Sequence, residues 1–284
     1  MTPRAGRPRP ALRRGKTRQA TGQAGLDWLN AFVAAFRTAF GAFMPAYLAG
    51  QGWTQAQIGI VLTAETVASM LTQVPGGAFI GATRHRRLVL GLAIAGAALA
   101  ALVIAALPLR MPVLLALLVH AAAGSIIAPG IAAVTVAMVG RRELGERLGR
   151  NVRFASIGSG AGAALMGLAA SVVSEGAVFV LAFLLAIPAL WALWTLHPRR
   201  QRRRRGGAVA PTDAMETHGS VRALLADRRM LVFAACITLF HFSSAALLAV
   251  AAAEVTRRAG LRAGALIAAF VIVPQVLVAL PSGA

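Results

Sequence analysis

Four ionisable side chains lie deep inside long apolar runs of this 284-residue chain: Arg37, Glu65, His120 and His241. An ionisable group buried in such a segment is costly, which makes it a candidate for function by default. Arg37 carries a permanent charge and a fork of donors suited to an anionic group. The two histidines titrate near neutral pH, so each is able to relay a proton or to contact a substrate. The competing interpretation is structural, because a lone histidine in a membrane helix is more often a hydrogen-bonded packing residue than a relay.

The composition indicates what kind of element positions these residues. Hydrophobic residues make up 58% of the chain and charged residues only 13%, with a mean hydropathy of +0.71. A soluble domain has about 25% charged residues, so the chain is predicted to be an integral membrane protein. The net charge of +20 does not indicate nucleic acid binding, because the arginines stand between apolar runs. The single cysteine, Cys236, excludes a disulfide framework and a cysteine-based metal site, and we expect no cofactor.

Eight apolar runs are long enough to cross a bilayer as helices, which takes about 20 residues each. Several of these runs are joined by very short connections and must be antiparallel neighbours. The sequence therefore predicts an all-α, polytopic membrane helix bundle. The expected spans cover residues 27–49, 54–82, 88–109, 112–136, 153–174, 177–196, 230–252 and 263–281.

The positive charges alternate between the two ends of these spans. Of the 28 Lys and Arg residues other than Arg37, 24 fall before the first span and in or at the edge of every second connection, against four in the other connections. Positive charge accumulates on the cytoplasmic side of membrane proteins. We therefore expect both termini in the cytoplasm and the chain in a bacterial inner membrane, in contact with its lipids.

Four segments follow from this pattern. Residues 1–26 form an Arg/Pro/Gly-rich tail that we expect to be disordered and cytoplasmic. Residues 27–196 form a six-helix bundle, and residues 197–229 form a basic cytoplasmic loop containing "RRQRRRR". Residues 230–284 begin a second half with the seventh and eighth spans.

The connection between the second and third spans carries a recognisable motif, within "PGGAFIGATRHRRLVL" at residues 75–90. It resembles the Gly-x-x-x-Asp-Arg-x-Gly-Arg-Arg/Lys motif of the major facilitator superfamily. Two residues of this chain match the motif. Of two further basic residues, one replaces the motif's first basic residue and the other extends its basic end. The motif's acidic residue and the arginine that follows it are replaced by other residue types. The matches are Gly77 and Arg86, the basic residues are His85 and Arg87, and the replacements are Gly81 and Ala82.

Three further stretches carry the same resemblance. In the fourth span, Gly124 matches the glycine of the family's Arg-x-x-x-Gly motif, whose arginine position is His120 here. The stretches "FHFSSAALLAV" at 240–250 and "VIVPQVLVAL" at 271–280 look like the family's seventh and eighth helices. The resemblance implies an MFS-like six-helix half followed by the first two helices of a second half.

In that family, the first, fourth and seventh helices line the central cavity. The resemblance therefore places Arg37, His120 and His241 at a substrate or coupling site, with Glu65 as a further candidate. It also implies a gating loop that includes Gly77, Gly81, Arg84, Arg86 and Arg87. The implied partners are a small-molecule solute and a proton or other coupling ion.

The resemblance leads to a secondary transporter that moves a small solute by alternating access, or to a fragment of one, since family members have twelve helices. Two other functions stay open. The chain is alternatively a non-transporting remnant or an assembly subunit, because the acidic latch is lost at Gly81. A membrane-embedded enzyme is a third interpretation, but the sequence contains no HExxH, GxSxG or aspartate-pair motif.

The sequence also predicts a direct ion pair between Arg37 and Glu65. Each lies about ten residues into its span, which is about 15 Å deep in a hydrocarbon core about 30 Å thick. The two spans are joined by a very short connection, so equal depth should bring the two charges together. The competing arrangement directs Arg37 into the cavity and leaves Glu65 protonated.

Overall fold

The computed structural model describes residues 10–41, 43–139 and 143–196, together with 228–229, 231–233, 235–236 and 239–240. The chain divides into two compact units, Met1–Pro198 with Gly264–Ala284, and Arg199–Ala263. The account below concerns residues 10–196 of the first unit. The expected seventh span, apart from a few helical residues, the eighth span, and most of the expected central loop lie outside the described residues.

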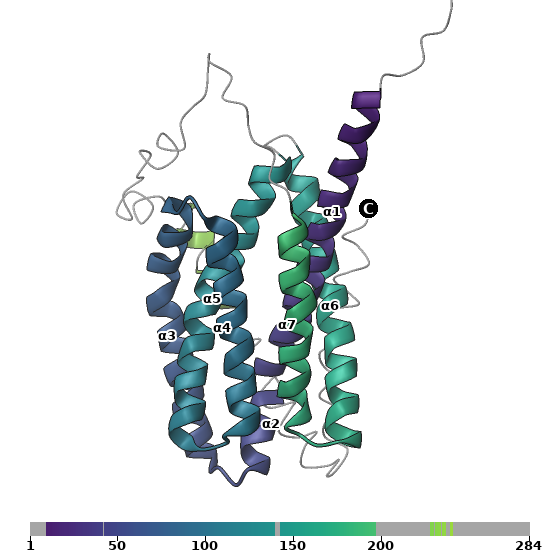
Figure 1. Cartoon of the computed structure of the whole chain (residues 1–284). Helices are drawn as coiled ribbons and strands as arrows, with labels where there is room; N and C mark the ends of the chain where they lie inside the picture. The colour runs from purple at the N-terminus through teal and green to yellow at the C-terminus, as the bar shows by residue number, and fades with distance from the viewer. Residues whose placement is uncertain are drawn as a thin grey trace, which may run out of the picture. The chain divides into compact units, whose positions relative to one another are not determined.

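Residues 10–196 form a bundle of helices, and no strand occurs among the described residues (Figure 1). Six stretches are long and apolar enough to cross a membrane. This confirms the predicted all-α membrane bundle. The elements in order are α1 (Pro10–Arg37), η1 (Thr38–Phe40), α2 (Phe43–Gly50), α3 (Gln55–Ala82), α4 (Arg86–Ala106), α5 (Arg110–Val139), α6 (Leu144–Val172) and α7 (Ala177–Thr195).

The expected first span is broken in the middle. Helix α1 ends at Arg37, the short 3-10 helix η1 follows, and the chain resumes as α2. Pro45 lies in the first turn of α2, where a missing backbone N–H costs no helical hydrogen bond. The break therefore places Arg37 at a helix end in the interior of a membrane span, rather than in a continuous helix.

Two other boundaries differ from the prediction. Helix α1 begins at Pro10, so residues 10–26 are helical, although the sequence predicted a disordered tail over 1–26. Proline suits the first position of a helix, and the alanine, arginine and glutamine residues that follow are good helix formers. Helix α6 begins at Leu144 rather than at 153, because its first turns carry arginines that bind another helix and do not form a loop.

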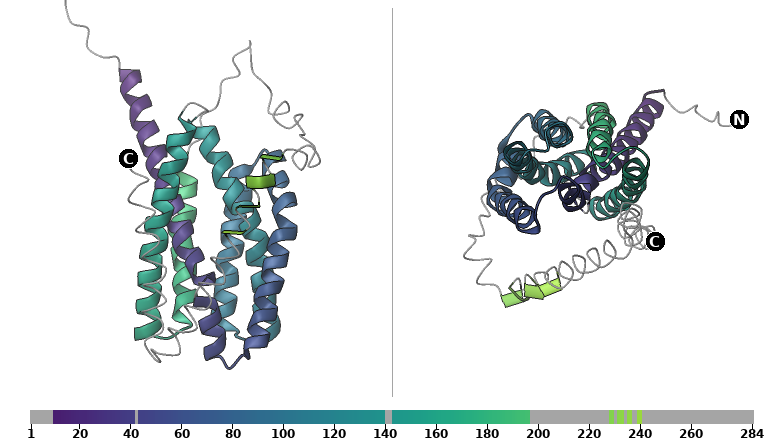
Figure 2. Two further views of the ribbon diagram at one scale, coloured as in Figure 1. Left: turned by 180° about the vertical axis from the view of Figure 1, so that it is seen from behind. Right: turned by 90° about the horizontal axis from the view of Figure 1, so that it is seen from below.

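The helices do not pack in the order of the chain. Helix α3 packs along α5, α4 packs along α5 and α7, and α1 packs along α6 and α7. Figure 2 shows α1 beside α6 when the bundle is seen from behind. Small residues allow the closest approach, because a methyl group added at Gly158 would collide with the backbone of Ala31. Close backbone contact of this kind stabilises helix pairs where lipid removes the hydrophobic drive.

One face of α3 exposes large apolar side chains, as expected for a surface that faces lipid. The residues on this face include Ile60, Val67, Met70, Leu71, Val74 and Phe79.

Candidate functional site: a buried polar cluster

Glu65 and His120 form a hydrogen-bonded contact inside the bundle. Glu65 lies in the first half of α3 and His120 lies near the middle of α5. The Glu65 Oε1 atom is 2.8 Å from His120 Nδ1, and the side chains are 16% and 10% exposed. Gly76 packs directly on Ser125, which lets α3 and α5 approach closely enough for this contact.

Phe40 fixes the plane of the imidazole. Its ring stacks on the His120 ring with 3.7 Å between centroids and an interplanar angle of 5°. Phe40 comes from η1, so the break in the first span supplies this contact. The other ring nitrogen of His120, Nε2, is buried and makes no hydrogen bond to any described residue. A buried polar atom without a partner is uncommon and calls for an explanation.

Arg37 lies against the same face of α5. A methyl group added at Gly124 would lie 3.5 Å from Arg37 Nη2. Phe40 follows Arg37 by three residues, and His120 precedes Gly124 by four. The contact of Arg37 with Gly124 and the contact of Phe40 with His120 therefore lie about one helical turn apart along α5. Among the described residues, no hydrogen bond or ion pair holds the guanidinium.

The prediction of a direct ion pair between Arg37 and Glu65 is wrong, because the Glu65 carboxylate contacts His120 instead. Their charges still attract each other at longer range. The prediction assumed that spans joined by a short connection pack along their lengths. Here α3 packs along α5 instead, so the equal depth of Arg37 and Glu65 does not bring the two side chains into direct contact.

Three of the four predicted site residues thus come together: Arg37, Glu65 and His120. The fourth, His241, lies outside the described residues. The prediction for that residue stays a prediction.

The gating-loop candidates lie at the end of α3 and the start of α4. Arg86 Nη2 donates to the Gly81 carbonyl at 3.0 Å. Arg87 Nη2 donates to the carbonyls of Leu193 and Trp194, at 3.1 and 2.6 Å, at the end of α7. Cations at a helix C-terminus bind its unpaired carbonyls and oppose the negative end of its dipole. Arg87 therefore ties the connection between α3 and α4 to α7.

Among the described residues, Gly77 and the side chain of Arg84 make no such contact, and Gly81 takes part only through its carbonyl. Arg84 is exposed, and nothing lies within 4 Å of a methyl group added at Gly77 or Gly81 in the described part of the chain. The two glycines are therefore not required for packing in this unit.

A second charged cluster was missed by the sequence analysis. Asp27 of α1 accepts a hydrogen bond from Arg147 at 2.7 Å and from Arg150 at 2.6 Å, both from the first turns of α6. Arg147 and Arg150 were counted as loop charges, although their spacing of three puts them on one helix face. Two features of the sequence could have indicated this cluster: an acidic residue at the start of a span, and two arginines spaced three apart just before another span.

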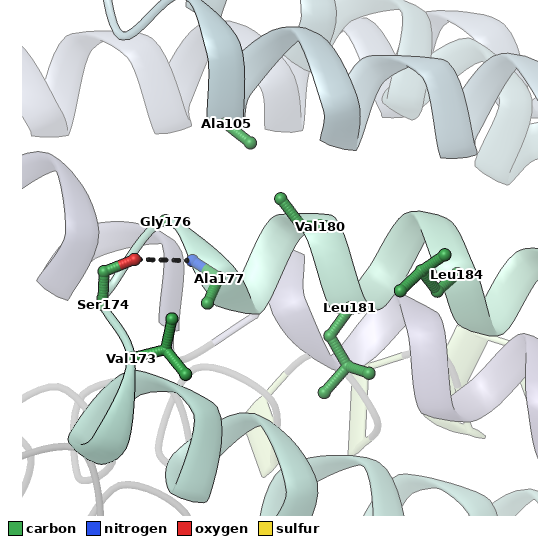
Figure 3. Close-up of a pocket in the computed structure, with 8 residues that line it drawn as sticks. All are labelled: Ala105, Val173, Ser174, Gly176, Ala177, Val180, Leu181 and Leu184. Atoms are coloured by element: carbon green, nitrogen blue, oxygen red, sulfur yellow. Dashed lines mark hydrogen bonds between the residues drawn. The ribbon is translucent and has the colours of Figure 1, made fainter.

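An apolar hollow lies where α4 ends and where α6 turns into α7, and Figure 3 shows the side chains that line it. Its walls come from the end of α4, the turn between α6 and α7, and the first two turns of α7, and include Ala105, Val173 and Val180. None of its lining residues is ionisable. This hollow therefore offers no chemistry comparable with the cluster around His120.

Comparison with known proteins gives consistent matches. The sequence model of the Major Facilitator Superfamily matches residues 27–284. Two uncharacterised MFS-type transporters of Mycobacterium tuberculosis, MT2531 of strain CDC 1551 / Oshkosh and Rv2456c of strain H37Rv, are each 30% identical over 229 residues. Each alignment covers 78% of this chain and 54% of the relative. The chain spans about half the length of the curated relatives it matches.

Proposed function

Because the chain belongs to the major facilitator superfamily, we propose that it acts in secondary active transport of a small solute by alternating access. The Glu65–His120 pair serves as its proton-carrying element. Membership confirms the resemblance in the sequence and makes the chain part of a transporter family rather than an enzyme. The single observation that carries the proposal is the 2.8 Å contact between Glu65 and His120 inside a membrane-spanning bundle.

The free-energy cost of placing Glu65 and His120 inside the membrane supports a functional role for the pair. A charged side chain at mid-membrane costs at least about 2.5–3.5 kcal/mol, and such residues mark substrate paths and proton relays. Apolar residues in place of Glu65 and His120 would give a well-packed bundle without that cost. A carboxylate and an imidazole in contact can share one proton and accept a second, which is what coupling to a proton gradient requires.

The connection between α3 and α4 is the proposed gating loop. Arg86 and Arg87 bind helix-end carbonyls on α3 and α7, and Arg84 is free of such contacts in the described structure. A loop held by two cations at helix ends can release and rebind as helices shift, at a modest cost in free energy.

The chain is proposed to lie in a bacterial cytoplasmic membrane with both termini inside. The arginines of the α3–α4 connection, the Asp27 cluster and the end of α7 gather at one end of the bundle. This is the end that the positive-inside rule assigns to the cytoplasm. Residues 1–26 and 197–229 are then cytoplasmic segments that flank the bundle 27–196.

The test is solute-driven proton movement in inverted membrane vesicles from cells producing the chain. Drugs, sugars, amino acids and organic anions are added in turn under an imposed pH gradient. A solute is expected that dissipates the gradient, and Glu65→Gln should abolish that effect while Glu175→Gln, at the outer end of the bundle, keeps it. Absence of any solute-dependent flux would contradict the proposal and favour the non-transporting remnant.

A further inference from the structure

The cluster around His120 also indicates what kind of solute it binds. We propose, on the basis of the transport function above, that the solute is a monoanionic carboxylate that binds together with one proton. Its carboxylate is held between the guanidinium of Arg37 and the Nε2–H group of His120. The inference rests on two groups of the cluster. His120 Nε2 is buried without a hydrogen-bond partner among the described residues, and the Arg37 guanidinium lies against Gly124 and is attracted by the charge of Glu65 without a direct ion pair to it.

The contact with Glu65 links the proton content of the pair to the state of Nε2. A hydrogen bond between Oε1 and Nδ1 at 2.8 Å requires one proton between the two atoms. Without a further proton, Nδ1 carries that hydrogen and donates it to the carboxylate, which leaves Nε2 as a bare acceptor. The histidine is then neutral and the glutamate ionised.

Adding one proton converts Nε2 into a donor, wherever the proton resides. Either the imidazole becomes doubly protonated beside an ionised Glu65, or a protonated Glu65 donates to Nδ1 and the ring hydrogen moves to Nε2. Both arrangements carry an N–H group at Nε2. An anion is repelled by the lone pair of the unprotonated state and accepted by the N–H of the protonated state, so anion and proton bind together.

Arg37 supplies the other half of the anion site. Its guanidinium lies against α5 at Gly124, one turn from the ring of His120. A methyl group added at this position would lie 3.5 Å from Nη2, at ordinary van der Waals distance. A guanidinium without a carboxylate partner keeps its paired N–H donors available, and these match the two oxygens of a carboxylate.

Within residues 10–196 that the structure describes, no further charged side chain comes from the middle of a membrane span that packs on α5. Helix α5 packs against α1, α3, α4 and α6. At the level of His120, α1 presents Arg37 and α3 presents Glu65. The charged residues of α4, α5 and α6 lie towards their ends: Arg86, Arg87, Arg110, Glu146, Arg147, Arg150 and Arg153. Among the described residues, the proton balance of the site therefore depends on Arg37, Glu65 and His120.

The net charge of the cluster selects the charge of the solute. With the pair unprotonated, Arg37 and Glu65 cancel and the cluster is neutral. One added proton gives a single positive charge, which a monoanion neutralises. A dianion such as a phosphate ester would leave an uncompensated negative charge in a low-dielectric interior, which is strongly unfavourable.

The test uses the chain in lipid nanodiscs with defined probes. Isothermal titration in two buffers of different ionisation enthalpy gives both the affinity and the number of protons taken up. The probes are benzoate and lactate, with benzamide, lactamide and phenyl phosphate as neutral and dianionic controls. We expect binding of a monocarboxylate with uptake of one proton. The affinity should then fall as the pH rises, by about tenfold per pH unit where one proton is taken up. The amides and the phosphate ester should bind at least about tenfold more weakly.

Variants assign the effect to residues. His120→Gln should remove the proton uptake and its pH dependence, and Arg37→Gln should weaken carboxylate binding at least about tenfold at every pH. His218→Gln, outside the described residues, is the matched control and should behave as the unaltered chain. The proton count measured on the unaltered chain stands even if a variant fails to fold.

Each outcome decides one proposal. Carboxylate binding without proton uptake, preference for an amide or the dianion, or no carboxylate binding overturns the inference. If vesicles nonetheless show solute-driven proton movement that Glu65→Gln abolishes, the transport proposal stands without it. Proton-linked carboxylate binding with no flux in vesicles would instead support the inference and contradict transport.

Discussion

Arg147 donates to Asp27 at 2.7 Å, and both side chains are only 4% exposed. The Nε and Nη1 atoms of Arg147 are buried without a hydrogen-bond partner in the described structure. This ion pair joins the start of α6 to α1, at the end of the bundle proposed to be cytoplasmic. Removal of one partner from a buried pair costs about 3–5 kcal/mol, because it leaves an uncompensated charge.

We predict that Asp27→Asn lowers the free energy of unfolding by about 3–5 kcal/mol. Arg150→Gln should cost much less, since that side chain is half exposed and Asp27 keeps Arg147 as its partner. Thermal unfolding of both variants in the same detergent measures the difference. Equal losses would show that the buried pair is no stronger than the exposed one.

The contact between α1 and α6 gives a second prediction. Gly158→Ala places a methyl group against the backbone of Ala31, which cannot yield without moving α1. Overpacking of this kind costs about 1–3 kcal/mol. Gly149→Ala in the same helix meets nothing within 4 Å and should be neutral or stabilise by up to about 1 kcal/mol. A midpoint of unfolding that is unchanged in Gly158→Ala would contradict the close packing of these helices.

Arg87→Gln should loosen the last turn of α7. The change removes the bonds to the carbonyls of Leu193 and Trp194 and the contact of the guanidinium with the Trp194 ring, 5.5 Å from its centroid. The expected loss is about 1 kcal/mol, seen as faster amide hydrogen exchange at the end of α7. Arg84→Gln, which alters an exposed side chain of the same connection, is the control and should leave that exchange unchanged.

Topology can be checked from single cysteines and from reporter fusions. A cysteine replacing Arg84 should be labelled from the cytoplasm, and one replacing Gln51, at the other end of the bundle, from outside. Reporters fused after residues 210 and 262 should also report opposite sides. Those two positions lie outside the described residues, and the same side for both would contradict the predicted seventh span.

Much of the fold follows from the sequence, because a run of about 20 apolar residues has few alternatives to a membrane helix. The six spans of the described bundle appear near their predicted positions. The break at residues 38–42 was not foreseen, since Gly41 and Pro45 were compatible with a kinked but continuous helix. It depends on packing of Phe40 against His120 and Phe179, which no local pattern reveals.

The sequence predicted which residues belong to the candidate site, but not which of them contact each other. Arg37, Glu65 and His120 stand out because charge inside an apolar run is costly. Which of them touch depends on α3 packing along α5, a contact between helices that do not follow each other in the chain. The ion pair of Asp27 was not predicted for a related reason. Its partners come from the first turns of α6, and the apolar pattern predicted a later start for that helix.

The central claim is that Glu65 fixes the tautomer of His120, and nitrogen NMR tests it most directly. The chain is labelled with ¹⁵N-histidine in nanodiscs, and the His120 signals are assigned by their absence in His120→Gln. At high pH we predict a protonated Nδ1 and a bare Nε2, and at low pH an Nε2 that carries a proton. Glu65→Gln should abolish this preference for the Nδ1–H form. A neutral His120 with its proton on Nε2 and a bare Nδ1 at high pH would contradict the account.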